Sequence, residues 1–359
     1  MPIKGNKKRA QVILDNSIQK LQDELSNTID SSSVKTDFYE FLQRWLIIIK
    51  ASVQDTTFSV YQKQVNGRIK RFFYDTKKYT LEGLKPNDIQ EFYFTILTDN
   101  CTTNTVIHYH AIIRKSLQYA VKNDLIDSNP ADKVEKPQKN TFIGSFYSIE
   151  ETQKLFECMA RTKLEIPTLL ACFYGLRRSE VLGLRWSSID FSNKVITINH
   201  VVTNIEIDGV RKIRKKNRTK TKSSFRSLPL VPEVEEKLLQ VKLEQQQRKK
   251  LLQTGYSNEF LDYICVDELG KILKPDFITK KFKKLLIQYE DLRIIRFHDL
   301  RHTCASLLLA SDVSLKEIQD WLGHSDFSTT ANIYAHLDSK SKKTSASAMS
   351  KTLNLNSSM

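Results

Sequence analysis

Apolar residues recur with the 3.6-residue period of an α-helix through the first third of the chain. One stripe extends over Phe38–Ile49 and a second, broader stripe over Val106–Val121. Pro86 suits the first turn of a further helix, where the missing N–H would have had no intrahelical partner. The pattern predicts a small all-helical domain over residues 36–132.

The segments around this domain have a different composition. Residues 1–35 are polar and charged, which predicts an N-terminal arm or helix that is partly disordered. Residues 127–140 contain two prolines and almost no apolar residue, so we expect a linker, placed at 133–145. A second domain is then expected over 146–338, followed by a Ser/Lys-rich tail.

The second domain mixes helical and strand patterns. Ser148 opens a Ser-Ile-Glu-Glu capping box, which indicates a helix start. Strand-like alternation covers 194–202, and Asp208-Gly209 is a hairpin turn signal. Helical patterns resume over 232–253, 275–289, 298–311 and 314–322. The predicted fold class is therefore mainly α with a small antiparallel sheet (α+β).

Charge adds a class of partner to this picture. The chain has 56 Lys+Arg against 41 Asp+Glu, a net charge of +15 at pH 7, so polyanions are its natural partners. DNA, RNA and an anionic membrane surface all fit this charge. The basic N-terminus is followed by no apolar signal region, so we expect a cytoplasmic protein with no membrane segment. Five scattered cysteines make a disulfide framework or a thiolate zinc site unexpected.

The first candidate for chemistry is Arg177, which follows Gly175-Leu176 and precedes a helical pattern. An arginine between a glycine turn and a helix can direct its planar guanidinium at two phosphate oxygens. The simpler interpretation is a surface arginine that pairs with Glu180 on a capped helix. Arg178 competes for the same role, and spacing does not choose between the two arginines.

A second candidate is a basic segment flanked by strand signals. It holds nine Lys or Arg residues and no acid: Arg211, Lys212, Arg214, Lys215, Lys216, Arg218, Lys220, Lys222 and Arg226. We expect a basic hairpin that lies along a DNA backbone. Such a hairpin could place one ammonium group, for instance that of Lys220, beside a leaving oxygen.

The third candidate starts at His298, which opens an apolar helical pattern. His298 and His302 stand four residues apart with Asp299 between them, as in H-E-x-x-H zinc enzymes. Arg301 would repel a cation, and no third ligand follows at the usual interval. His298 and Arg301 share a face at a helix N-terminus, which favours an anion. We therefore expect an oxyanion site with no metal.

These motifs occur in one order, and the chain closes with Tyr334 after a Leu-Gly-His sequence. Over residues 36–340 it strongly resembles the tyrosine recombinases, specifically the phage and conjugative-transposon integrases. The resemblance implies Glu180 as the accessory acid and selects Arg177 over Arg178. The implied catalytic set is Arg177, Lys220, His298, Arg301, His324 and Tyr334.

The resemblance also implies a mechanism. Tyr334 attacks the scissile phosphate of double-stranded DNA, giving a 3′-phosphotyrosine and a free 5′-hydroxyl that can attack a partner strand. Lys220 is the implied general acid for the 5′-oxygen, His298 the implied proton acceptor for the tyrosine, and His324 the residue that orients the phosphate. Neither a cofactor nor ATP is needed.

The implied architecture is a helical core-binding domain of the SAM-like type and a mixed α/β catalytic domain that close around DNA as a C-shaped clamp. Implied partners are DNA attachment sites, further copies of the chain (a dimer per site and a tetramer in synapsis) and an accessory DNA-bending or excision factor. Residues 339–359 would dock on a neighbouring copy. Two alternatives remain: a type IB topoisomerase, and a DNA-binding protein without catalytic activity.

Overall fold

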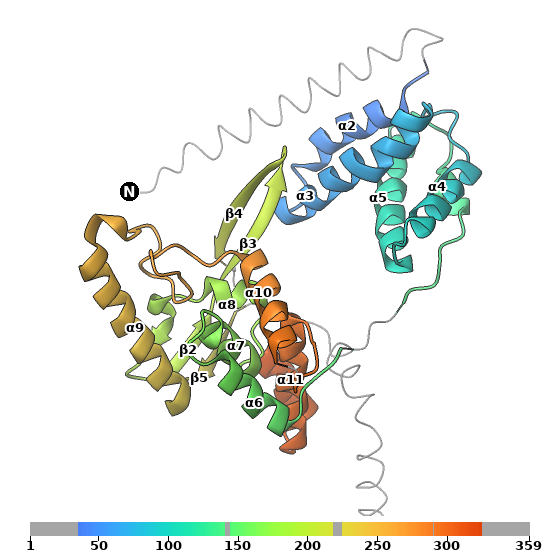
Figure 1. Ribbon diagram of the computed structural model, residues 1–359. Helices are drawn as coiled ribbons and strands as arrows, with labels where there is room; N and C mark the ends of the chain where they lie inside the picture. The colour runs from blue at the N-terminus through green and yellow to red at the C-terminus, as the bar shows by residue number, and fades with distance from the viewer. Residues whose placement is uncertain (1–34, 141–143, 218–224, 290, 325–359) are drawn as a thin grey trace, which may run out of the picture. The chain divides into compact units, whose positions relative to one another are not determined.

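The computed structural model describes residues 35–140, 144–217, 225–289 and 291–324 (Figure 1). The chain divides between Thr141 and Phe142 into two compact units, and Ile205–Val210 group with the first unit. The described elements are mainly helices with small antiparallel sheets, which confirms the predicted fold class. Within the described residues, no helix combines the length and the apolar character needed to cross a membrane.

The first unit is helical, and local sequence signals start its helices. Asp37 caps the first helix by accepting hydrogen bonds from the backbone N–H groups of Tyr39 and Glu40 at 2.9 and 3.1 Å. Pro86 occupies the first position of its helix, as predicted. The elements of this unit are α2 (Phe38–Ile49), α3 (Asp55–Gln64), two π-helical segments (Val65–Ile69 and Arg71–Thr76), α4 (Pro86–Thr98), α5 (Thr103–Lys122) and a 3₁₀ turn (Pro130–Lys133).

The first unit extends further along the chain than its composition suggested. Ala131 and Val134 are 0% and 8% exposed and belong to its apolar core. Asn129 caps the 3₁₀ turn that positions them, because its side chain accepts a hydrogen bond from the Ala131 N–H. The predicted linker at 133–145 thus overlaps this core at Val134, because the turn buries the few apolar residues that are present.

The predicted hairpin is present as β3 (His200–Ile207) and β4 (Val210–Asn217). Asp208 and Gly209 both have positive φ, 54° and 74°, as a two-residue turn between right-twisted strands requires. Residues 205–210 pack within the first unit, where Ser59 Oγ donates to the Glu206 carbonyl at 2.8 Å. The turn signal thus located the hairpin correctly.

The second unit is built around α7. This helix contacts α6, α8, α9 and α11, and Figure 1 shows it among them. The predicted capping box is present at the start of α6, since Ser148 and Glu151 cap each other. The helices are α6 (Ile149–Met159), α7 (Glu165–Phe173), α8 (Arg178–Gly183), α9 (Pro232–Leu252), α10 (Pro275–Gln288), α11 (Leu300–Ala310) and α12 (Leu315–Leu322), with 3₁₀ turns at Trp186–Ser188, Gln253–Gly255 and Phe297–Asp299.

A three-stranded antiparallel sheet accompanies these helices, in the order β1 (Ile189–Asp190), β2 (Val195–Ile198), β5 (Arg226–Pro229). Ile196 lies opposite Leu228, and Ile198 lies opposite Arg226. Along β5 the residues alternate between buried and exposed, and Arg226 and Leu228 are both buried. The sheet therefore carries one arginine into the interior of the second unit.

Candidate active site

Arg177 is placed by a glycine turn between α7 and α8. Gly175 has φ +61°, and a Cβ atom added there would lie 2.2 Å from Leu322 Cδ2, so the turn has no room for a side chain. Arg177 is the residue before α8 and remains partly exposed. Its Nη1 donates to Glu180 Oε1 at 3.0 Å, and its backbone N–H donates to Glu180 Oε2 at 2.9 Å. Both its backbone and its guanidinium are thus held by one carboxylate.

Arg301, in the first turn of α11, is only 2% exposed. Its Nη1 donates to the Gly175 carbonyl at 2.6 Å and its Nη2 to the Leu322 carbonyl at 2.8 Å. Burial and the nearby charge of Arg177 lower the pKa of Arg301 to about 9, which is still far above neutral pH. Arg301 is therefore a fixed cation whose orientation is set by two backbone carbonyls.

Both guanidinium groups reach the C-terminal turn of α12. The Arg177 Nη2 lies 3.5 Å from the Gly323 carbonyl oxygen, beside the Leu322 carbonyl that Arg301 binds. Gly323 ends α12 with φ +68°, a left-handed conformation that terminates the helix. The carbonyl end of a helix carries partial negative charge, which stabilises nearby cations. This turn holds the two arginines in one place.

The same turn positions His324. Arg301 Nε donates to His324 Nε2 at 3.1 Å. Arginine has no acceptor, so Nε2 is the unprotonated nitrogen and the proton is on Nδ1. Burial, followed by the charges of Arg301 and Arg177, lowers the pKa of His324 to about 3. His324 is therefore neutral at physiological pH.

His298 lies in the 3₁₀ turn that precedes α11, and its ring contacts that of His302. Desolvation, followed by the charges of His302 and Arg301, lowers the pKa of His298 below its usual value, although the residue as a whole is exposed. His298 is thus neutral near pH 7, which is the form that accepts a proton.

The structure separates the two arginines that spacing left open. The Arg178 Nη1 donates to Thr279 Oγ1 of α10 at 2.6 Å and lies 3.4 Å from the Pro275 carbonyl oxygen. Its guanidinium is directed at α10, whereas that of Arg177 shares the α12 turn with Arg301.

The zinc alternative receives no support from the described residues. Asp299, the acid of the H-D-x-x-H pattern, is 1% exposed and accepts hydrogen bonds from the Arg296 guanidinium at 2.6 Å and the Arg296 backbone N–H at 2.8 Å. Among residues 35–140, 144–217, 225–289 and 291–324, no group of three or more His, Cys, Asp or Glu side chains could hold a metal ion.

The basic hairpin is partly described. Arg211, Lys212, Arg214, Lys215 and Lys216 are exposed on β4. The Lys215 ammonium also pairs with Glu259 at 2.8 Å. The strand thus presents a row of cations to solvent, while Arg218, Lys220, Lys222 and the nucleophile candidate Tyr334 lie outside the described residues.

Among the described cations of the basic segment, Arg226 does not fit an exposed DNA contact. It is only 9% exposed, and its Nη2 donates to Glu180 Oε2 at 3.1 Å. A DNA contact was expected for Arg226 because of the charge of the segment. The alternation of buried and exposed residues along β5 instead places Arg226 on the buried face. Sequence reasoning missed its link to Glu180, although the Arg226-x-Leu228 spacing of two was a usable signal.

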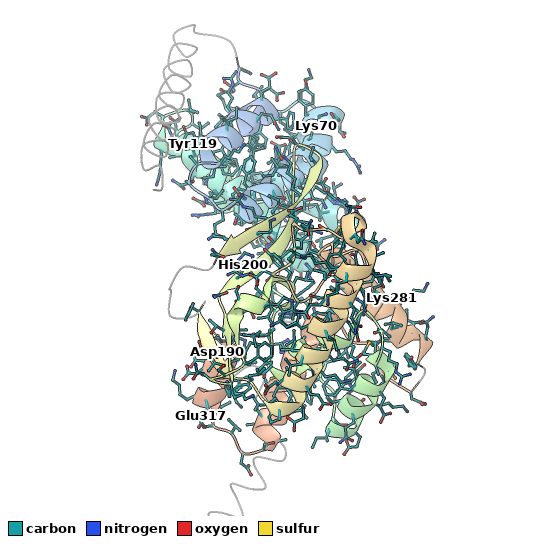
Figure 2. All side chains as sticks on the ribbon, turned by 90° about the vertical axis from the view of Figure 1, so that its left-hand side faces the viewer. Lys70, Tyr119, Asp190, His200, Lys281 and Glu317 are labelled. Atoms are coloured by element: carbon teal, nitrogen blue, oxygen red, sulfur yellow. The ribbon has the colours of Figure 1, made fainter. Side chains whose placement is uncertain are left out.

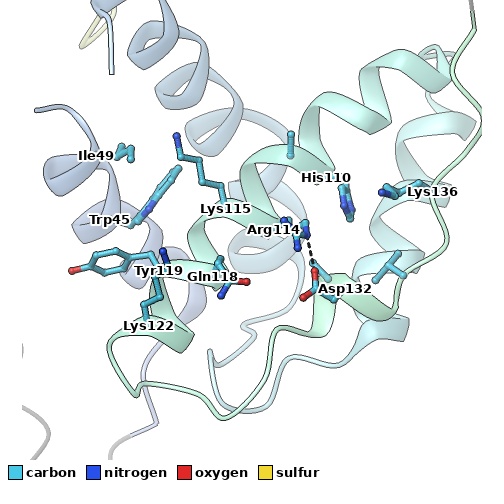
Figure 3. Close-up of a pocket in the computed structure, with 13 residues that line it drawn as sticks. Trp45, Ile49, His110, Arg114, Lys115, Gln118, Tyr119, Lys122, Asp132 and Lys136 are labelled. Carbon is cyan, nitrogen blue, oxygen red and sulfur yellow. Dashed lines mark hydrogen bonds and ion pairs between the residues drawn. The ribbon is translucent and has the colours of Figure 1, made fainter. Parts of the chain in front are cut away.

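A further cationic surface lies in the first unit. An open groove of about 900 Å³ runs beside α5 and is lined by Arg114, Lys115, Lys122 and Lys136 (Figure 3). His110, at its edge, is buried and bonded to the Tyr93 hydroxyl at 2.7 Å, which explains this histidine as structural. The groove contains none of the predicted catalytic residues.

Comparison with known proteins identifies the family. The model described as Phage integrase family matches residues 147–341, more than half of the chain, and that described as Phage integrase SAM-like domain matches residues 37–136. The chain belongs to the phage integrase family. It is a tyrosine-type site-specific recombinase, an enzyme that breaks and rejoins DNA strands.

Similar members of the family include a tyrosine recombinase and a transposon transposase. A tyrosine recombinase XerC-like protein of Caldanaerobacter subterraneus subsp. tengcongensis is 29% identical over 325 residues, covering 84% of this chain and 80% of that protein. The transposase from transposon Tn916 of Enterococcus faecalis is 26% identical, covering 72% of this chain and 64% of that protein.

Solved structures share the fold. The Tn1549 transposon integrase in complex with transposon right end DNA has a TM-score of 0.70 at 19% identity, covering 87% of this chain and 100% of that chain. A lambda integrase tetramer bound to a Holliday junction has a TM-score of 0.60 at 15% identity, covering 86% and 80%. At these identities the likeness is one of fold, with a SAM-like domain followed by an integrase catalytic domain.

Proposed function

We propose that this recombinase integrates and excises a mobile element or prophage, and that it cleaves its DNA sites with Tyr334 as the nucleophile. The hydroxyl oxygen of Tyr334 forms a bond to the scissile phosphorus as the bond to the 5′-oxygen breaks. The products are a 3′-phosphotyrosine and a 5′-hydroxyl, and attack of a 5′-hydroxyl on the phosphotyrosine rejoins a strand and releases the enzyme.

The observation that carries this proposal is the pair of arginines on the α12 turn. Arg177 and Arg301 come from two helix starts and are oriented by Glu180 and by the Gly175, Leu322 and Gly323 carbonyls. Fixed cationic donors stabilise the charge on the non-bridging oxygens of a transferring phosphate without reorganising during the reaction. These two guanidinium groups fulfil the role that a metal ion has in other phosphoryl transfers.

We assign the proton transfers to two further residues and the orientation of the phosphate to a third. His298, neutral near pH 7, accepts the proton of the attacking tyrosine, and Lys220 donates a proton to the 5′-oxygen. His324 orients the phosphate through its bond to Arg301. The exposed cations of β4 and the groove beside α5 contact the DNA backbone.

The assembly follows from the chemistry. One nucleophile cuts one strand, so two strands at one site require two copies and two recombining sites require four. The lambda integrase relative was solved as a tetramer on a Holliday junction, the four-way intermediate that exchange of one strand pair produces. We propose the same assembly for this chain, with accessory DNA-bending proteins setting its direction and residues 339–359 docking between copies.

The test is covalent capture. Purified protein is incubated with sheared DNA from its source genome, adducts are recovered after denaturation, and the attached ends are sequenced. We expect one recurring site with protein on the 3′ phosphate. Tyr334→Phe should bind that site and form no adduct, because one hydroxyl is lost and no cation is removed.

The recovered site also separates the proposal from its alternatives. Two duplexes that carry the site should yield recombinant joints, whereas a topoisomerase would relax a supercoiled plasmid without joining two sites. An adduct that persists in Tyr334→Phe would show that another tyrosine is the nucleophile, and the absence of any adduct from the unmodified chain would leave a DNA-binding protein.

A further inference from the structure

Glu180 connects two arginines that come from distant parts of the chain. It is fully buried, at 0% exposed. Its Oε1 accepts from Arg177 Nη1 at 3.0 Å, and its Oε2 accepts from the Arg177 backbone N–H at 2.9 Å and from Arg226 Nη2 at 3.1 Å. The side chain that orients Arg177 is therefore itself held by Arg226.

The charge of Glu180 depends on these arginines. Burial on its own would raise the pKa of this carboxyl and neutralise it. Against that burial, the charge of Arg226, followed by that of Arg177, lowers the pKa of Glu180 to about 2. Both arginines thus keep this buried carboxylate in its charged form.

The Arg226 guanidinium is held by its hydrogen bond to Glu180. The Nε and Nη1 atoms of its buried side chain have no hydrogen-bond partner among the described residues, so the bond to Glu180 is the one that anchors its guanidinium there. Its backbone is fixed by pairing with Ile198 across β2 and β5. Strand β5 therefore supplies a second cation to Glu180, at the oxygen that also accepts from the Arg177 backbone N–H.

The proposed chemistry makes no use of Arg226, and its burial keeps it from the DNA backbone. Its charge is nevertheless close enough to lower the pKa values of Arg301 and His324. Three guanidinium groups and one carboxylate form one cluster with an excess of positive charge. Removal of Arg226 would take one cation away from Glu180 and allow the carboxylate to shift toward Arg177.

We propose that Arg226 is a positioning residue for strand cleavage: by binding Glu180 from the β5 side, it fixes the carboxylate that holds Arg177 toward the scissile phosphate. This inference rests on the role given to Arg177 in the proposed function. It predicts that a substitution of Arg226 lowers the cleavage rate only when Arg177 is present.

The experiment measures single-turnover cleavage and DNA binding separately, on a nicked duplex of the site recovered by covalent capture. Arg226→Gln should slow cleavage by about 10- to 100-fold, the value of one hydrogen bond between charged groups. Its dissociation constant for the duplex should stay within about twofold of that of the unmodified chain, because no DNA contact is removed. Arg226→Lys keeps a charge beside Glu180 and should recover most of the lost rate.

Two further variants keep the test decisive. Arg226→Met fills the same buried volume with an apolar chain, which guards against a folding defect of the glutamine variant, and it should show the same loss of cleavage. Arg178→Gln removes a neighbouring arginine bound to Thr279 and should cleave at the normal rate. Thermal unfolding of every variant shows whether a loss of rate reflects a loss of structure.

Coupling to Arg177 is the readout that a purely structural role would not produce. In an Arg177→Ala background, Arg226→Gln should change the remaining rate by no more than about twofold. A full additional loss there would overturn the inference, as would normal cleavage by both Arg226→Gln and Arg226→Met. If Arg177→Ala itself cleaves normally, the failure lies in the proposed function; if it is inactive while the Arg226 variants are normal, only the present inference fails.

Discussion

Replacement of Gly175 by alanine should destabilise the second unit and loosen Arg301. The backbone of Gly175 has φ +61°, where a residue with a side chain costs about 1–2 kcal/mol. The new Cβ would lie 2.2 Å from Cδ2 of Leu322, a residue that is 0% exposed, so the core must shift. Overpacking of this kind costs about 1–3 kcal/mol, which brings the expected total to about 2–5 kcal/mol.

Calorimetry of the whole chain would measure this effect. A loss of that size should lower the Tm of the second unit by about 4–20 °C. Gly209→Ala is a control for the backbone contribution alone: Gly209 groups with the first unit and also has positive φ, +74°, but a Cβ there would meet no atom within 4 Å. The control should therefore lose only the backbone contribution, about 1–2 kcal/mol.

Cleavage gives a second measure of the same change. The Gly175 carbonyl accepts from Arg301 Nη1, and the displaced Leu322 carries the carbonyl that accepts from Nη2. Gly175→Ala should therefore cleave more slowly even at temperatures where it is fully folded. The reasoning is refuted if Gly175→Ala is no less stable than Gly209→Ala and cleaves at the normal rate.

Two predictions concern the chemistry itself. Cleavage should persist in EDTA, since Arg177 and Arg301 supply the charge that a metal would; a loss of cleavage that zinc or magnesium restores, with DNA binding unchanged, would revive the H-D-x-x-H metal site. Lys220→Ala should slow cleavage far more on a normal phosphodiester than on one whose bridging 5′-oxygen is sulfur, because a thiolate leaves without protonation. Equal slowing on both substrates would make Lys220 a phosphate contact and Lys222 the next acid to examine.

Features with a local physical cause were predictable from the sequence. The Ser148 capping box, Pro86 at a helix start and the Asp208-Gly209 turn are each decided by backbone needs within a few residues, and all three were confirmed. The order of chemical motifs identified the family because a conjunction of individually weak signals is specific.

Features that depend on long-range packing were not predictable in the same way. Whether Arg177 or Arg178 belongs to the site depends on the position of α10, which spacing along α8 does not contain. The burial of Arg226 depends on its pairing with β2, and the charge of the surrounding segment concealed it. His200 is a similar case: this buried ring (labelled in Figure 2) bonds Asn217 and Tyr263, and its sequence gave no indication of either partner.

Acid should reveal the state of His324. Its pKa is about 3 in the folded chain, below the usual value of 6.5, because partial burial and the charges of Arg301 and Arg177 disfavour its protonated form. Below about pH 6.5 the unfolded chain binds a proton at this histidine and the folded chain does not. The contribution of His324 to the free energy of unfolding is therefore complete above that pH and declines as the pH falls toward 3.

The size of this decline can be bounded and tested. One proton taken up only on unfolding changes stability by at most about 1.4 kcal/mol per pH unit, and partial exposure of the ring reduces this to about 1 kcal/mol. Since other groups titrate in the same range, the informative quantity is a difference. His324→Asn keeps an acceptor for Arg301 Nε and has no titrating group, so between pH 6 and pH 5 its free energy of unfolding should decline less steeply than that of the unmodified chain by about 1 kcal/mol per unit. Denaturant unfolding at several pH values measures both slopes, and identical slopes would mean that His324 is protonated in the folded chain and does not accept the hydrogen bond from Arg301.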